Sequence, residues 1–115
     1  LKTVKNISLY ISEEYLKIFE KTKIIAVMNP EDVAHGDIVW STDSSDIIYL
    51  SGKGYVRCIG NGTATVRATV KNPDGTYTTG VISINCQLNS FEIILASMFK
   101  YIFIFNDYIE SAYMV

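Results

Sequence analysis

The chain has 115 residues, of which 49% are hydrophobic and 19% charged, and its formal net charge is −2 at pH 7. This length supports one domain with a single core, and the composition excludes a disordered polypeptide. The near balance of basic and acidic side chains, with the basic ones scattered, excludes an electrostatic footprint for nucleic acid. The chain opens at Leu1 without a basic or apolar leader. Either a leader has been removed or, as we expect, the chain is a piece of a longer polypeptide.

Alternating apolar residues predict short strands over the first 40 residues. Pro30 is expected to end one of them, because proline cannot donate to a strand ladder. The segment 12–21, "SEEYLKIFEK", also fits a short helix that Ser12 would cap. The residues that share an apolar parity in this part of the chain are Ile7, Leu9, Ile11, Ile24, Ala26, Met28, Ile38 and Trp40.

Three turn signals divide the middle of the chain into further strands. "DIIYL" and "YVRCI" flank Gly52-Lys53-Gly54, which predicts a hairpin that depends on Gly54. In "GNGTATVRATV", Gly62 permits a turn, and small and β-branched residues then alternate. "NPDG", with Pro73 and Gly75, has the chemistry of a type I turn. The residues predicted to point inward from these strands are Val56, Ala64, Val66, Ala68, Val70, Ile82 and Ile84.

The number of short strands predicts the class of fold. About seven strands separated by turns, with no helical period through residue 88, favour an antiparallel β-sandwich. The two cysteines, Cys58 and Cys86, fall on the apolar parity of their strands and lack the partners of a zinc site. We predict that they are buried free thiols, and a disulfide is the alternative.

Residues 5 to about 86 resemble the bacterial immunoglobulin-like domain of group 2, the BIG2 family. The most specific part is "VWSTDSSDIIYLSGKGYVRCIGNGTATVRAT" at 39–69, and "IIAVMNP" at 24–30 falls where that family has an early strand and its closing proline. The resemblance implies an all-β protein, with an immunoglobulin-like antiparallel β-sandwich over residues 1–88. In that sandwich Trp40 is expected to fill the space between the two sheets.

Residues 89–115 form a hydrophobic and aromatic C-terminal extension that the resemblance does not cover. A strand over "KYIFIFNDYI" would be apolar on both faces, and the apolar run is shorter than a helix that spans a bilayer, so a membrane span is not expected. The extension would pack on its own sandwich, pack on neighbouring chains, or be sequence appended to the domain; we expect the second. The candidate interaction residues are Phe99, Tyr101, Phe103, Phe105 and Tyr108.

A search for catalytic or metal-binding chemistry finds few candidates. His35 is the only histidine and lies in a polar connection, so we predict a solvated loop side chain. Asp37, Asp43 and Asp46 would offer oxygen ligands to Ca²⁺, but their spacing matches no EF-hand loop, and we predict solvated turn carboxylates. We therefore expect no enzyme activity, no cofactor and no metal site.

The resemblance implies a module of bacterial cell-surface or secreted proteins, or of phage virions. We predict a non-catalytic structural or adhesion module that acts as a spacer, a decoration or a binding unit, with other protein chains, possible neighbouring copies among them, as partners. The alternative is a carbohydrate-binding accessory domain of a secreted enzyme. Such a domain would bind a surface glycan through exposed aromatic rings, for which the candidates outside the extension are Tyr49, Tyr55 and Tyr77.

Overall fold

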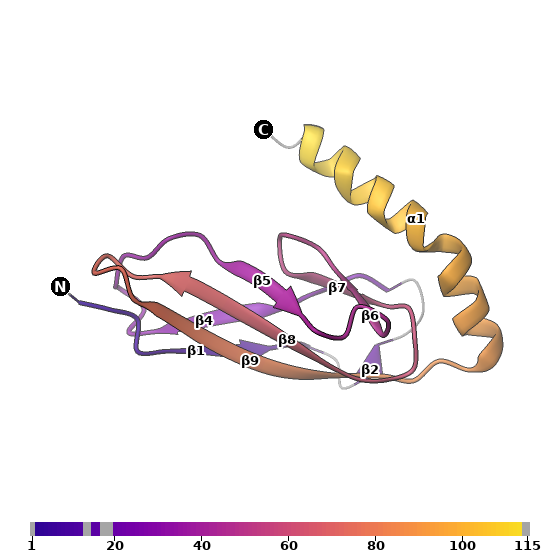
Figure 1. Cartoon of the computed structure of the whole chain (residues 1–115), viewed down its shortest axis with the longest axis horizontal. Helices are drawn as coiled ribbons and strands as arrows, with labels where there is room; N and C mark the ends of the chain where they lie inside the picture. Colours follow the sequence, from indigo (N-terminus) through magenta and orange to yellow (C-terminus); the bar gives the residue numbers. More distant parts are fainter. Residues whose placement is uncertain (1, 13–14, 17–19, 114–115) are drawn as a thin grey trace.

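The computed structural model describes residues 2–12, 15–16 and 20–113, and it shows two β-layers with a long helix at the C-terminal end (Figure 1). The predicted immunoglobulin-like antiparallel sandwich is confirmed. Every apolar strand face needs a partner layer that removes it from water, and two facing sheets meet this need in a chain of this length.

The first layer is held together by one continuous segment. Strand β4 (Ile25–Asn29) pairs with β1 (Asn6–Tyr10), and β3 (Thr22–Lys23) pairs with β7 (Tyr55–Cys58), which in turn pairs with β6 (Ile48–Leu50). Only Ile24 separates β3 from β4, and its N–H donates to the carbonyl oxygen of Gly54 at 2.9 Å. The two short sheets therefore act as one layer.

The second layer is built around a long hairpin. Strands β8 (Gly62–Lys71) and β9 (Tyr77–Cys86) pair along ten residues each, and Figure 1 shows them running along the sandwich. Strand β5 (Val39–Thr42) pairs with β8 and forms one edge, and β2 (Tyr15–Leu16) pairs in parallel with β9 at the other. The strand at 15–16 replaces the helix considered for 12–21; residues 13–14 and 17–19 of that segment lie outside the described part of the chain.

The core contains most of the residues that the alternation placed inward. Of the fifteen residues predicted to point inward, the structure buries ten, which are Ile7, Leu9, Ile24, Met28, Val56, Ala64, Val66, Ala68, Val70 and Ile84. It leaves the other five, Ile11, Ala26, Ile38, Trp40 and Ile82, partly buried and packed against that cluster. Gly80 permits a close approach of β1 to β9, because a Cβ there would lie 2.5 Å from the carbonyl oxygen of Ile7.

Both predicted hairpin turns are present. The N–H of Gly54 donates to the Ser51 carbonyl at 3.2 Å, and the N–H of Gly75 donates to the Asn72 carbonyl at 2.9 Å. Gly54 and Gly75 both have positive φ, as does Gly62 before β8, so each turn uses a conformation that favours glycine. Pro73 is exposed within the second turn.

Asn72 ties this second turn to the start of the chain. Its side chain is buried and accepts a hydrogen bond from the N–H of Val4 at 2.9 Å. Its amide donates to the hydroxyls of Thr76 at 3.2 Å and Thr78 at 2.9 Å, and Thr78 donates to the Val4 carbonyl at 2.6 Å. These hydrogen bonds therefore replace the ones that the polar atoms of the buried amide would make to water.

Asp74 in the same turn provides a pH-dependent prediction. The Thr76 hydroxyl donates to its carboxylate at 2.6 Å and the Thr76 N–H at 2.9 Å, and these bonds lower the pKa of Asp74. We expect Thr76→Val, which removes the hydroxyl, to raise this pKa toward its ordinary value in an NMR pH titration of the carboxyl. An unchanged pKa would contradict the assignment.

The sign of the stability effect follows from the direction of this pKa shift. Because the folded pKa lies below the unfolded one, the interaction stabilises the fold above about pH 4 and is lost as the pH falls through the lowered pKa. The difference in unfolding free energy between the wild type and Thr76→Val should therefore be larger at neutral pH than near pH 2.

The two cysteines correct the sequence prediction. Cys58 at the end of β7 and Cys86 at the end of β9 form a disulfide and are not free thiols. Both are buried, as their parity indicated. Their positions in the alternation predict that each cysteine lies on the inward face of its own sheet. Only the packing of one layer on the other brings the two sulfur atoms together. The disulfide therefore links the two layers covalently.

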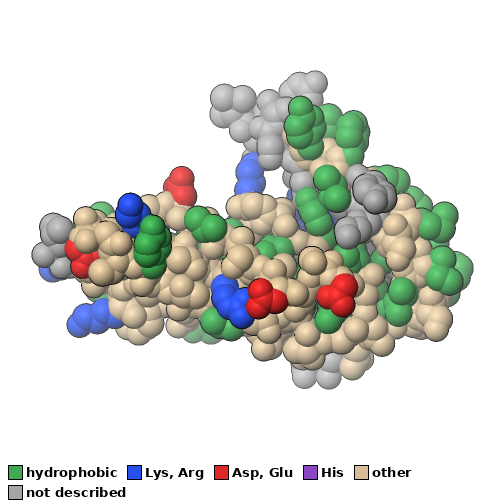
Figure 2. All heavy atoms as spheres, in the orientation of Figure 1, with side chains coloured by type: hydrophobic (Ala, Val, Ile, Leu, Met, Phe, Trp, Pro, Cys, Tyr) green, Lys and Arg blue, Asp and Glu red, His purple; other side chains and the backbone are tan. Residues whose placement is uncertain are grey.

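The C-terminal extension is a helix, α1 (Ser90–Tyr113). Asn89 caps it: its side-chain oxygen accepts from the N–H of Glu92 at 2.8 Å, and the Glu92 carboxylate accepts from the N–H of Asn89 at 3.1 Å. The helix leaves the end of the sandwich and turns back over it, and Figure 2 shows hydrophobic side chains along it. Within the described part of the chain, no helix combines the length and the apolarity needed to cross a membrane.

Candidate functional site

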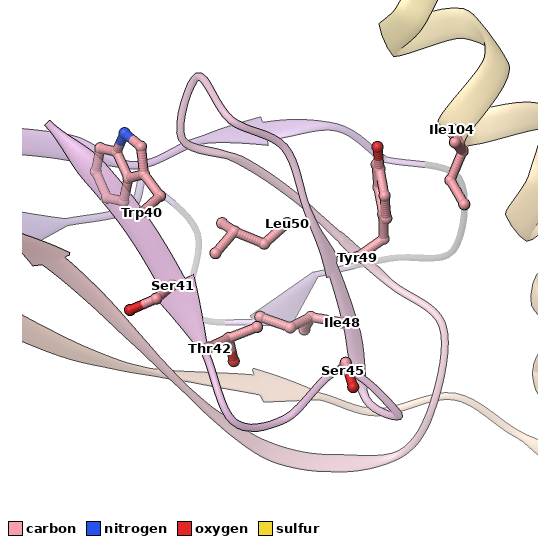
Figure 3. A pocket seen from close by; sticks show the side chains of 8 residues that line it. All are labelled: Trp40, Ser41, Thr42, Ser45, Ile48, Tyr49, Leu50 and Ile104. Carbon is pink, nitrogen blue, oxygen red and sulfur yellow. The ribbon is translucent and has the colours of Figure 1, made fainter. Parts of the chain in front are cut away.

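A groove of about 340 Å³ lies between β5 and β6, where α1 passes over the sandwich (Figure 3). Strand β5 is an edge of the four-stranded sheet, and β6 is an edge of the three-stranded sheet. The groove therefore opens where the two layers part. Its lining residues are Trp40, Ser41, Thr42, Ser45, Ile48, Tyr49, Leu50 and Ile104.

Hydrogen bonds fix the polar side of the groove. The Thr42 hydroxyl donates to the Thr65 carbonyl at 2.6 Å and accepts from the N–H of Ser44 at 3.0 Å. The Ser44 hydroxyl accepts from the N–H of Thr65 at 3.3 Å. These bonds hold the start of the β5–β6 connection against β8, so this wall of the groove is preformed.

Trp40 lies at the end of the groove, where it is partly buried and packed against the core cluster. Its ring lies against the β6–β7 turn, where a Cβ on Gly54 would be 2.6 Å from Cε2. Because β5 is an edge strand, Trp40 also lines the groove that opens beside that edge. The indole is thus part of a surface that a partner can contact.

The ammonium groups of two lysines lie over the rings of Tyr55 and Trp40. The Lys21 ammonium lies 4.5 Å from the Tyr55 ring centroid, and the Lys23 ammonium lies 5.0 Å from the same centroid and 5.9 Å from that of Trp40. Lys23 also donates to the Lys53 carbonyl. These cation–π contacts place positive charge beside Trp40, at the end of the groove.

The three tyrosines proposed for sugar binding do not form one row. Tyr49 and Tyr55 lie on β6 and β7 of the first layer and are partly buried, whereas Tyr77 is exposed at the start of β9 in the second layer. The ammonium groups of Lys21 and Lys23 already lie over the Tyr55 ring. A flat aromatic platform for a glycan is therefore not assembled by these three side chains.

The candidate polar residues are exposed. Asp37, Asp43 and Asp46 are all solvent-exposed, and Asp43 pairs with Arg67 at 2.9 Å. No group of three or more His, Cys, Asp or Glu side chains able to hold a metal occurs among the residues that the structure describes. His35 is exposed in its loop, with Nδ1 2.6 Å from the Gly36 carbonyl oxygen.

The candidate interaction residues of the extension have different surroundings. Phe99 is partly buried and packs against the sandwich core, whereas Phe105 and Tyr108 are exposed. The side chains of Tyr101 and Phe103 lie outside the described ones. Sequence reasoning missed Ile104 of the groove. It also missed Phe91, Ile94, Met98 and Ile102, although the three- and four-residue spacing of these four is a helical signal.

Two comparisons with known proteins bear on this fold. The family model of the bacterial Ig-like domain (group 2) matches residues 3–80, which include all the strands except the last part of β9. No curated protein matches the chain.

Proposed function

Because the chain belongs to the bacterial Ig-like domain family of group 2, we propose that it is a non-catalytic structural or adhesion module of a larger extracellular assembly. That assembly is a bacterial cell-surface protein or a phage virion. The chain acts there as a spacer, a decoration or a binding unit, and other protein chains are its partners.

The Cys58–Cys86 disulfide is the observation that carries this proposal. Disulfides persist in oxidising surroundings, such as the cell surface and the exterior of virions, and are rare in the cytosol. This bond is buried and joins the two layers of the sandwich. A covalently linked sandwich suits a module that has to keep its shape outside the cell.

The edge strands support binding as part of this role. An edge strand offers backbone groups to which an extended segment of a partner can add. Here β5 and β6 border the groove, and Trp40, Tyr49 and Leu50 supply apolar contact area beside those edges. Rigid scaffolds of this kind bind through loops and edges without a reactive group.

Thiol trapping in the cells or particles that contain the chain tests the proposal. Free thiols are alkylated on lysis, and the state of Cys58 and Cys86 is read by mass spectrometry in cytosol, envelope, medium and purified virions. We expect the disulfide-linked form in the envelope, medium or virion fraction. Free thiols in a chain confined to the cytosol would overturn the proposal.

A further inference from the structure

Among the side chains of α1 that the structure describes, one apolar face meets the sandwich and a second apolar face is exposed. Ala96 is fully buried, and Ile93 and Phe99 pack against the core. The outer stripe comprises six large side chains that are each between 47% and 70% exposed. Its members are Phe91, Ile94, Met98, Ile102, Phe105 and Tyr108.

The spacing of the outer stripe is that of a helix–helix seam. With Phe91 at the first position of a heptad, residues 94, 98, 105 and 108 fall on the two positions that form the core of a coiled coil. Ile102 lies directly beside them. At about 100° per residue the six side chains occupy about one third of the circumference. The stripe runs from Phe91 to Tyr108, which is about 26 Å along the helix.

The charge of α1 argues against a lipid surface as its occupant. Helices that lie on membranes carry Lys and Arg on their polar face. The sequence of α1 holds Glu92, Asp107 and Glu110 but a single lysine, Lys100. Its net charge is negative, so an anionic bilayer would repel it.

The charged positions of α1 lie off the seam, so they permit a second copy of the chain as its occupant. The positions that flank the seam, 95, 97, 102, 104, 109 and 111, are Leu, Ser or Ile, so two copies meet without like charges facing each other across it. A uniform apolar stripe is complementary to itself, which is what a two-fold interface requires.

The exposed area fits such a pair. Six large side chains that are half to two thirds exposed offer on the order of 700 Å² per copy, and a stable interface needs about 800 Å² per partner. Contacts at the margins of the stripe supply the difference. Soluble monomers rarely expose an apolar patch of this size.

We propose that the outer stripe of α1 packs against the same stripe of a second copy, so that the chain self-associates through its C-terminal helix. This inference deepens the proposed function by naming one protein partner and its surface. Its test is the oligomeric state, which is independent of where the chain resides.

Analytical ultracentrifugation of the full chain over a range of concentrations tests the inference. We expect a concentration-dependent dimer or larger oligomer. Phe105→Glu and, separately, Met98→Glu should raise the apparent dissociation constant by at least about tenfold, because each buries a charge in the seam. The matched control is Val81→Glu, since Val81 is 58% exposed but lies on the sandwich. It should leave the dissociation constant unchanged.

Circular dichroism of each variant shows whether the sandwich is still folded. The inference fails if the folded wild type is a monomer at the highest concentration, or if Val81→Glu weakens association as much as the two stripe variants do. A further arm uses vesicles of neutral and of anionic phospholipid. A chain that is monomeric in buffer but co-sediments with vesicles would place lipid, and not a second copy, on the stripe.

Discussion

Removal of the Cys58–Cys86 disulfide is expected to lower the free energy of unfolding by about 3–4 kcal/mol. The two cysteines are 28 residues apart, and the bond closes a loop that contains β8 and most of β9. Closing a loop of this length lowers the conformational entropy of the unfolded chain. Because the folded chain is already ordered, the cross-link raises the free energy of the unfolded state relative to the folded one. Urea unfolding of the oxidised chain and of the Cys58→Ala/Cys86→Ala variant, followed by circular dichroism, measures the difference.

Reduction of the wild type provides the control for this prediction. The reduced wild type should unfold at nearly the same urea concentration as the double variant, because both lack the cross-link. A reductant should leave the double variant unchanged. Oxidised and reduced wild type that unfold at the same urea concentration would show that the bond does not hold the layers together.

The sandwich was predictable from the sequence because its signals are local. Alternation at 62–71 fixes which side chains of β8 point inward, and Gly54, Pro73 and Gly75 mark turns whatever lies elsewhere in the chain. The family resemblance rests on the same residues. Within the described residues, the strands and their hairpins therefore follow the pattern closely.

The disulfide and the position of Trp40 depend instead on how the layers pack. Parity shows that Cys58 and Cys86 point into the core, but it does not show which residue of the opposite sheet each one meets. Trp40 has the parity of a core residue and packs against the core, but that parity does not show that its ring meets Gly54 in the turn of the opposite layer. Neither outcome follows from period-two alternation in a single strand.

The candidate groove also could not be predicted from the alternation within single strands. It combines residues of β5 and β6, which belong to different sheets, with Ile104 of α1. The heptad spacing of residues 91, 94, 98 and 105 was present in the sequence, but aromatic and β-branched residues in this segment also fit a strand. The packing of Ile93, Ala96 and Phe99 on the sandwich stabilises the helix over the strand.

Truncation of Ile84 to alanine is expected to cost about 2–5 kcal/mol of unfolding free energy. Ile84 on β9 has no exposed surface, and its cross-strand neighbour on β8 is Ala64, which is also fully buried. Alanine at 64 has no side chain able to move into the space left by the isoleucine, so the cavity stays open. The loss is thus the transfer free energy of the removed carbons together with a cavity cost.

The same strand offers a matched control for this prediction. Val81→Ala shortens an exposed side chain on β9 and should cost less than about 1 kcal/mol, since it changes strand propensity but leaves no cavity. Urea unfolding should show a lower midpoint for Ile84→Ala with an unchanged slope, because the surface exposed on unfolding is nearly the same. Equal midpoints for the two variants would mean that Ile84 is not part of a close-packed core, and the two layers would then have to be held together mainly by the disulfide.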